Sequence, residues 1–196
     1  TRKESSAASD VYKRQILGLS IKVNAEINRI VSGQDDAKIT IIAYESLTCS
    51  HCADFHNNIY PLLKKEFIDT GLVKIEFRHF PLDIIALNAS KISQCKQDQS
   101  LEIMMSLYSD QQAWIKGKTI EEANENLKKF VANQNFNLDF EKCISDKKIE
   151  DFVLTDRIEG TKKFEINSTP TIIINGKKFE KTLNYKNLKK YLEKLI

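Results

Sequence analysis

The sequence predicts an α/β fold in which an all-helical segment interrupts a central mixed β-sheet flanked by helices. Residues 38–80 show a strand, a helix and a second strand in succession, whereas residues 83–164 show only the apolar stripes of helices. From residue 167 onward the pattern returns to two short strands and a final helix. Strand–helix–strand units have parallel strands joined by a right-handed crossover, so these observations predict one sheet with a helical insertion.

Composition limits the function classes. The chain has 196 residues, of which 41% are hydrophobic and 29% charged, with a formal net charge of +3. This length suits one domain, or one domain with an insertion, and allows a substantial core. Lys and Glu are interspersed along most of the chain, as on solvated helix surfaces, so we expect no nucleic-acid binding. We also expect a monomer. No run of eighteen apolar residues is present to predict a membrane span.

The N-terminal stretch does not fit the rest of the sequence. Residues 5–15 have neither a helical nor a strand period and resemble a translated sequencing adapter, so we exclude residues 1–15 from the fold. We expect that the native residues before Ile16, including a secretory signal, are missing. Residues 16–37 are interpreted as an N-terminal arm, and the amphipathic residues 21–33 as a short helix or arm within it.

The first strand is predicted at Lys38–Tyr44, which is apolar and β-branched. A helix follows from Cys52, with apolar residues spaced by three or four; Pro61 interrupts this pattern and predicts a kink. Thr70 and Gly71 end the helix, and residues 73–80 alternate apolar and polar side chains, as a half-buried strand does.

Residues 83–164 form the predicted helical insertion. Apolar stripes predict helices around residues 85–95 and 101–108, and Thr119 with Glu122 has the capping-box spacing at the start of another. A short helix is predicted around residues 140–144 and a longer one over residues 147–164.

The chain then returns to β structure. Residues 167–170 predict a turn, Thr171–Ile174 a short buried strand, and Asn175-Gly176 a tight hairpin into a partner strand at residues 177–179. The apolar positions between Tyr185 and Leu195 predict a final amphipathic helix.

The chemically informative motif is Cys49-Ser50-His51-Cys52, which joins the first predicted strand to its helix. Two thiols three positions apart can pair with each other, and the first lies in the field of the helix N-terminus. The spacing alone also occurs in zinc sites, but its position between a strand and a helix favours disulfide exchange.

These features together resemble the DsbA family of thiol–disulfide oxidoreductases, whose thioredoxin fold carries a helical insertion. The resemblance extends from about Ala37 to Ile196, with residues 38–82 and 165–196 as the thioredoxin-fold domain and 83–164 as the insertion. The residues that carry it are Ser46 to His56 around the cysteines, Phe80-Pro81-Leu82-Asp83, Ser168-Thr169-Pro170-Thr171 and Ile174-Asn175-Gly176.

The resemblance implies a role for each matched residue. Cys49 would be the exposed nucleophile and Cys52 the buried resolving thiol, with their redox-active disulfide in place of a cofactor. Thr169-Pro170 would contain a cis peptide bond beside the cysteines, and Thr169 would offer its backbone to an extended substrate. Helix N–H groups and a protonated His51 would stabilise the Cys49 thiolate, and a stabilised reduced form makes a disulfide oxidising.

Two positions depart from the family pattern. Members often have proline directly after the nucleophile, where this chain has Ser50, so the reduction potential can differ in either direction. Members also often have a carboxylate six residues before the nucleophile, thought to relay the proton of the resolving thiol. That position is Ala43; Glu45 lies on the same strand face by alternation and is the candidate substitute.

Cys95 and Cys143 both fall in the insertion. They can be two free buried thiols or, as in some alphaproteobacterial relatives of the family, a structural disulfide, which would stabilise the fold by roughly 4 kcal/mol in the loop-entropy model. A disulfide would suit the periplasm. The resemblance then implies reduced, newly exported polypeptides as substrates and a DsbB-like membrane oxidase linked to quinone as the reoxidising partner.

Three other functions remain open. The same dithiol could serve a disulfide isomerase or a thioredoxin-like reductase. The more distant alternative is a zinc-binding structural module that uses Cys49, Cys52 and His56 with His79 or Cys95, although a second CxxC or an HxxxH is absent from the sequence. Without zinc ligation, His56 is interpreted as a packed helix residue and His79 as a residue at a strand end.

Overall fold

A five-stranded mixed sheet forms the centre of the structure, which is a computed structural model describing residues 27–196. The strand order is β1-β3-β2-β4-β5; β2 and β3 are parallel, and the other three pairings are antiparallel. The predicted parallel strand–helix–strand unit is therefore confirmed. The strands are β1 (Ile30–Ser32), β2 (Ile39–Glu45), β3 (Val73–His79), β4 (Thr171–Ile174) and β5 (Lys177–Lys178).

Helical segments account for most of the remaining described chain. Those that follow β2 run without a break from Ser50 to Ile68 and alternate between α-helical and π-helical hydrogen bonding. They are α2 (Ser50–Asp54), η1 (Phe55–Ile59), α3 (Tyr60–Leu63) and η2 (Lys64–Ile68). The others are α4 (Ile84–Gln94), α5 (Ser100–Ser109), α6 (Gln111–Trp114), α7 (Ile120–Asn133), α8 (Phe140–Ser145), α9 (Lys147–Phe164) and α10 (Tyr185–Leu192).

Side chains at helix starts explain several of these boundaries. Asp83, Thr119, Asp139, Asp146 and Asn184 each accept a hydrogen bond from a backbone N–H in the first turn that follows them. Satisfying these N–H groups fixes where a helix begins. The capping spacing noticed in the sequence is thus confirmed at the start of α7.

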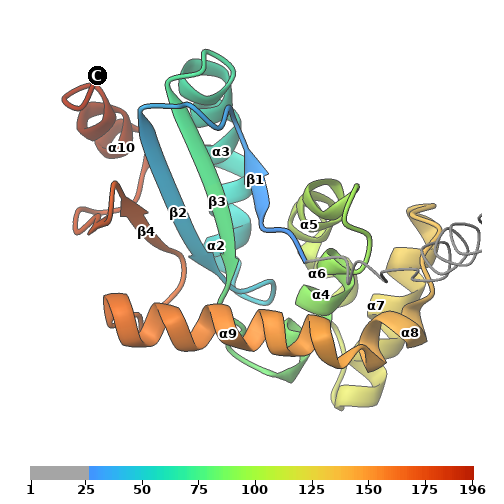
Figure 1. The fold of residues 1–196 in the computed structure, drawn as a ribbon. Helices are drawn as coiled ribbons and strands as arrows, with labels where there is room; N and C mark the ends of the chain where they lie inside the picture. The colour runs from blue at the N-terminus through green and yellow to red at the C-terminus, as the bar shows by residue number, and fades with distance from the viewer. Residues whose placement is uncertain (1–26) are drawn as a thin grey trace, which may run out of the picture.

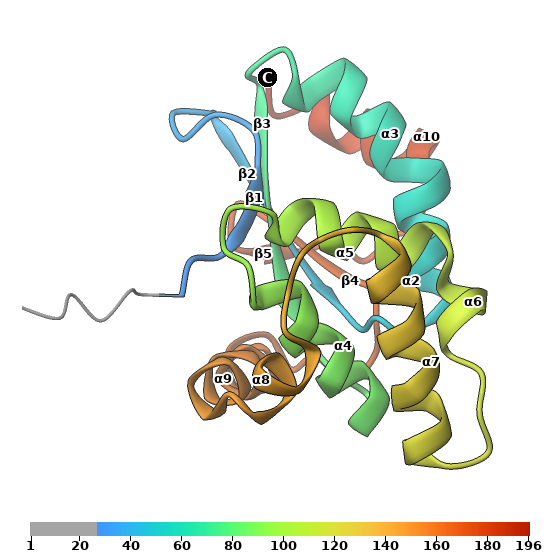
Figure 2. The ribbon, with the colours of Figure 1, turned by 90° about the vertical axis from the view of Figure 1, so that its right-hand side faces the viewer.

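Successive side chains of β2 point to opposite faces of the sheet, and an apolar cluster covers each face. Ile41 and Ala43 lie in the larger cluster, which includes residues of α2, α3 and α10, whereas Tyr44 lies in a smaller cluster on the opposite face. Gly160 of α9 packs there, so close that an added Cβ would lie 2.7 Å from a ring carbon of Tyr44. Figure 2 shows α3 and α10 on one side of the sheet and α9 on the other.

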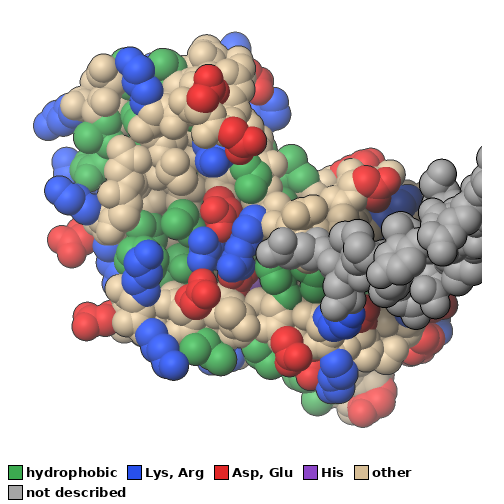
Figure 3. Space-filling model, in the orientation of Figure 1, with side chains coloured by type: hydrophobic (Ala, Val, Ile, Leu, Met, Phe, Trp, Pro, Cys, Tyr) green, Lys and Arg blue, Asp and Glu red, His purple; other side chains and the backbone are tan. Residues whose placement is uncertain are grey.

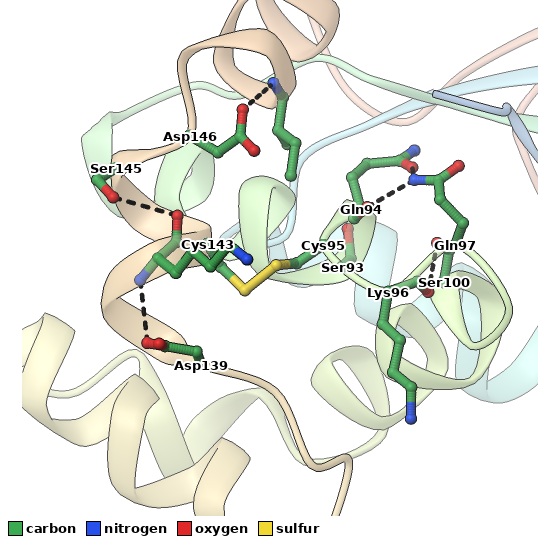
Figure 4. Close-up of a disulfide and its surroundings, with 12 residues drawn as sticks. Ser93, Gln94, Cys95, Lys96, Gln97, Ser100, Asp139, Cys143, Ser145 and Asp146 are labelled. Carbon is green, nitrogen blue, oxygen red and sulfur yellow. Dashed lines mark hydrogen bonds between the residues drawn. A yellow bond between two sulfur atoms is a disulfide. The ribbon is translucent and has the colours of Figure 1, made fainter. Parts of the chain in front are cut away.

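The helical insertion lies beside one end of the sheet. Figure 1 shows α9 running across the foot of the sheet and α4 to α8 gathered at one side. A disulfide between Cys95 and Cys143 joins the end of α4 to α8, with a Cα–Cα distance of 5.5 Å (Figure 4). The insertion therefore has a covalent link of its own, spanning 48 residues of sequence.

Charged side chains of both signs lie next to one another across the middle of the face drawn in Figure 3. Among the ion pairs of the structure, Arg78 binds Glu76 and Glu159 with nitrogen–oxygen distances of 2.6 and 2.9 Å. No helix of residues 27–196 combines the length and the apolar character needed to cross a bilayer.

The structure corrects the sequence predictions at two places. Ile30–Ser32, expected within a helix or arm, is strand β1 and pairs with β3. Gln111–Trp114, for which no element was predicted, is helix α6. At Pro61, where a kink is predicted, the helical segments continue, and a wider π-helical turn precedes the proline, with the Tyr60 N–H bonded to the Phe55 carbonyl. The proposed adapter segment and residues 16–26 of the arm lie outside the described residues.

Candidate active site

The two cysteines occupy the junction between β2 and α2. Cys49 is the N-cap residue of α2, and its carbonyl oxygen accepts hydrogen bonds from the N–H groups of Cys52 and Ala53, both at 3.1 Å. Cys49 is partly exposed, whereas Cys52, one turn on, is fully buried. Both are free thiols, so the structure describes the reduced pair.

The loop before β4 meets this pair from the other side. The Thr169–Pro170 peptide bond is cis, and the sulfur of Cys49 lies 3.3 Å from the carbonyl oxygen of Thr169. As a thiol, Cys49 donates to this carbonyl. The Thr169 hydroxyl is buried and bonds to no other described residue, so its hydrogen can turn toward Cys49 when that sulfur is ionised. The structure thus places Thr169 and Pro170 at the nucleophile, 120 residues away in sequence.

The surroundings of Cys49 favour its thiolate. Hydrogen bonding from the Cys52 thiol is the largest influence that lowers the pKa of Cys49, followed by the Thr169 side chain and the backbone N–H groups of Cys52 and His51. Partial burial opposes these donors. Their sum lowers the pKa of Cys49 from 9.0 to about 5, so the sulfur is mostly ionised at neutral pH.

Cys52 has the opposite tendency. Burial is the main cause that raises its pKa, its hydrogen bond to Cys49 adds to the effect, and the negative charge of Glu45 adds further. The two thiols therefore differ in the sense that exchange chemistry requires: one is stable as an anion and the other retains its proton.

Glu45 is buried at the end of β2 and forms a pair with His56. Its Oε2 lies 2.6 Å from Nε2 of His56, while its Oε1 is buried and bonds to no other described residue. Burial raises the pKa of Glu45, and the positive charge of His56 partly offsets this rise. Glu45 also lies close enough to Cys52 for its charge to raise the pKa of that thiol. The relay role of Glu45 stays a prediction.

His56 is packed as the sequence suggested, but it also has this polar partner. Its ring stacks on Tyr108 with 4.1 Å between ring centroids, and Nδ1 lies 3.3 Å from the sulfur of Met105. Both neighbours belong to α5, so the helical insertion fixes the orientation of the imidazole. No feature of the sequence predicted that His56 pairs with Glu45.

The two residues between the cysteines are exposed. His51 contributes its backbone N–H to the Cys49 thiolate, whereas its imidazole forms none of the hydrogen bonds found among residues 27–196. Ser50 borders a cavity of about 380 Å³ between α2 and the start of α6, and its hydroxyl makes no hydrogen bond to the described residues. The expected electrostatic role of the His51 side chain stays a prediction.

Two residues of the insertion contact the turn before Cys49. Gln111 donates to the carbonyl oxygens of Leu47 and Cys49, and Asp83 accepts a hydrogen bond from Thr48. Asp83 belongs to a segment that the family resemblance singled out, but Gln111 was missed. Gln111 lies in a stretch for which no element was predicted, and nothing in that stretch links a glutamine to the turn before Cys49.

The other residues named for the zinc alternative, Cys95 and His79, are not available as ligands beside the dithiol. Cys95 is bonded to Cys143, and His79 is buried at the end of β3, where burial lowers its pKa to about 3. Within residues 27–196, no three or more His, Cys, Asp or Glu side chains gather closely enough to hold a metal ion. The geometry therefore offers no ligand set to the zinc alternative in this part of the chain.

Comparison with known proteins agrees with this geometry. A family model described as thioredoxin (Thioredoxin_4) matches residues 25–194. The chain belongs to the thioredoxin family. Within that family it is DsbA-like: it is 32% identical to Wolbachia pipientis alpha-DsbA1, whose crystal structure superposes with a TM-score of 0.76 over 86% of this chain and 90% of that one. The expected fold class and family are thus confirmed.

Curated relatives are more distant. The chain is 27% identical over 168 residues to a candidate protein-disulfide oxidoreductase of Rickettsia bellii, covering 84% of this chain but 63% of the relative. It is 25% identical over 174 residues to disulfide bond formation protein D of Bacillus subtilis, covering 84% of this chain and 75% of that protein. This chain thus spans somewhat less than two thirds of the length of the Rickettsia bellii relative.

Proposed function

We propose that this chain is a thiol–disulfide oxidoreductase that introduces disulfide bonds into exported polypeptides through Cys49 and Cys52. The observation that supports this direction is the stabilised Cys49 thiolate, with its pKa lowered to about 5. Stabilising the reduced form makes the corresponding disulfide a stronger oxidant. The names of the relatives, protein-disulfide oxidoreductase and disulfide bond formation protein, support the same reaction class.

The reaction proceeds in two exchanges. A substrate thiolate attacks the sulfur of Cys49 in the oxidised protein, which forms a mixed disulfide and releases Cys52 with the bonding electron pair. A second substrate thiolate then attacks the substrate sulfur of the mixed disulfide and releases Cys49 as a thiolate. The substrate loses two electrons and gains a disulfide, and the two electrons remain on Cys49 and Cys52. A leaving thiol of low pKa departs faster, which favours the second step.

The proton for Cys52 comes from the Glu45–His56 pair in this scheme. Cys52 is released inside the protein, where burial strongly disfavours its thiolate, so it needs a proton donor that is itself buried. Glu45 has a pKa raised by burial and a proton shared with His56 at 2.6 Å. The carboxylate thus takes the role that the family pattern gives to the position of Ala43.

Thr169 provides the adjacent backbone for an extended substrate segment. By the family resemblance, the substrates are reduced polypeptides in the periplasm, the chain acts as a monomer, and a DsbB-like membrane protein passes its electrons to quinone. The disulfide between Cys95 and Cys143 supports an oxidising compartment.

The decisive experiment compares wild type with Cys49→Ala in the oxidative refolding of a reduced disulfide protein. The oxidised wild type should accelerate disulfide formation, and the variant should not. The reduction potential of the Cys49–Cys52 pair, measured against glutathione, separates the alternatives: a value near −120 mV supports an oxidant and one near −270 mV a reductase. Faster rearrangement of a scrambled substrate, without net oxidation of a reduced one, would instead support an isomerase.

A further inference from the structure

The turn before Cys49 is held by the helical insertion and not only by the thioredoxin-fold elements around it. We call residues 46–49, which join β2 to α2, the nucleophile turn. Gln111, the first residue of α6, is only 4% exposed. Its amide nitrogen Nε2 lies 2.8 Å from the carbonyl oxygen of Leu47 and 3.1 Å from that of Cys49.

The two carbonyl groups bound by Gln111 belong to the turn before α2 and to the residue at which α2 begins. They flank Thr48, so the primary amide, with two N–H hydrogens, can satisfy one acceptor on each side of it. The Cys49 carbonyl is also the first acceptor of the active-site helix, because the N–H groups of Cys52 and Ala53 bind to it. Gln111 is therefore bonded to the group on which α2 begins.

A second bond from the insertion holds the same turn. The Thr48 hydroxyl donates to Oδ2 of Asp83 at 2.7 Å, and Oδ1 of Asp83 accepts the Ala86 N–H at 2.7 Å, where α4 begins. The Leu82 N–H also lies 3.3 Å from the hydroxyl oxygen of Ser46. The nucleophile turn is thus bonded from the starts of two insertion helices, α4 and α6.

We propose that Gln111 is a positioning residue for the nucleophile: through its bonds to Leu47 and Cys49 it orients the Cys49 sulfur and the first N–H groups of α2. The donors that stabilise the thiolate include the backbone N–H groups of His51 and Cys52, whose directions follow from the path of this turn. Gln111 touches no reacting atom and acts through the backbone. The inference deepens the proposed function by giving the insertion a part in setting how reactive the dithiol is.

The test uses Gln111→Leu in the full chain, with Gln112→Leu as the matched control. Leucine has a similar size but cannot donate a hydrogen bond, and Gln112 is the exposed neighbour on the same helix. The pKa of Cys49 is measured in the reduced protein from thiolate absorbance during a pH titration. We expect Gln111→Leu to raise this pKa by about half a unit to one unit, the scale of one hydrogen bond, and the control to leave it unchanged.

The exchange equilibrium with glutathione gives a second readout. It should shift several-fold toward the oxidised protein in Gln111→Leu, because the reduced form has lost stabilisation. Should leucine prevent folding, Gln111→Met provides a flexible side chain of similar length that also cannot donate a hydrogen bond, and the same pKa rise is expected. A folded variant with lower stability to urea but an unchanged Cys49 pKa and exchange equilibrium would overturn the proposal and leave Gln111 a purely structural residue.

The Gln111 experiment can fail or succeed independently of the test of the proposed oxidase function. The pKa titration needs no substrate and no direction of electron flow. If wild type failed to oxidise a reduced substrate while Gln111→Leu still raised the pKa of Cys49, the oxidase function would be wrong and the positioning role would stand.

Discussion

The stability of the reduced protein should have a pH-dependent part that comes from Cys49. Folding lowers the pKa of Cys49 from 9.0 to about 5, so the folded state binds the proton less tightly than the unfolded state. The resulting stabilisation is complete above pH 9, declines as the pH falls toward 5 and is absent below that value. Four units at about 1.4 kcal/mol each give an upper limit of about 5.5 kcal/mol, which solvent screening of the partly exposed sulfur reduces to about 2–3 kcal/mol.

Urea unfolding of wild type and Cys49→Ser measures this effect. Both proteins are kept reduced with a phosphine between pH 4 and pH 9. The loss of the Cys95–Cys143 disulfide and the titration of groups that do not interact with Cys49 are common to both and cancel, whereas Glu45 and Cys52 are influenced by the Cys49 charge and belong to the measured difference. The free energy of unfolding of wild type should exceed that of the variant by an amount that grows with pH by about 2–3 kcal/mol. Curves that stay parallel to within about 0.5 kcal/mol would refute the stabilised thiolate.

Three further changes probe other parts of the structure. Replacing both Cys95 and Cys143 by alanine should lower the free energy of unfolding of the oxidised protein by about 4 kcal/mol, measured in urea, because the bond closes a loop of 48 residues; no change would mean that the bond does not constrain the chain. Gly160→Ala should cost about 1–3 kcal/mol, since its Cβ would clash with the Tyr44 ring at 2.7 Å; thermal unfolding would show it, and a neutral result would mean that α9 shifts freely. Glu45→Gln should slow oxidation of a dithiol peptide at pH 7 by at least about tenfold in stopped-flow measurements, with its fold retained, because an amide N–H is too weakly acidic to transfer its proton. An unchanged rate would exclude the proton path.

Much of the fold could be predicted because its signals are local. The bounds of α9, residues 147–164, agree with the structure to the residue, since Asp146 caps its start and the chain turns into the left-handed region at Glu165. The hairpin at Asn175 and Gly176 also follows from local backbone preference, as both have positive φ. Strand β1 was missed because three residues are too few to show a period, and it is a strand only because β3 pairs with it.

The candidate site likewise contains residues that the sequence could predict and residues that it could not. The dithiol and the Thr169-Pro170 loop carry recognisable residue types, so a resemblance could bring them together across 120 positions. Alternation along β2 placed Glu45 on the face of Ala43, but nothing in the sequence paired it with His56. Gln111 could not have been predicted at all, because a glutamine in a helical segment has many possible partners, and only the packing of the insertion selects the Leu47 and Cys49 carbonyls.

The two departures from the family pattern have different consequences in this geometry. The groups that lower the pKa of Cys49 are the Cys52 thiol, Thr169 and backbone N–H groups, so none of them requires a particular side chain at Ser50. The carboxylate position is different, because the proton for Cys52 must come from a group at a defined place. Ala43 provides none, and Glu45, two residues on, faces the same side of β2 and binds His56 at 2.6 Å. The departure at Ser50 therefore leaves the stabilisation of the nucleophile in place. The departure at Ala43 matters for the proposed mechanism, which assigns the proton of Cys52 to the Glu45–His56 pair held by the insertion.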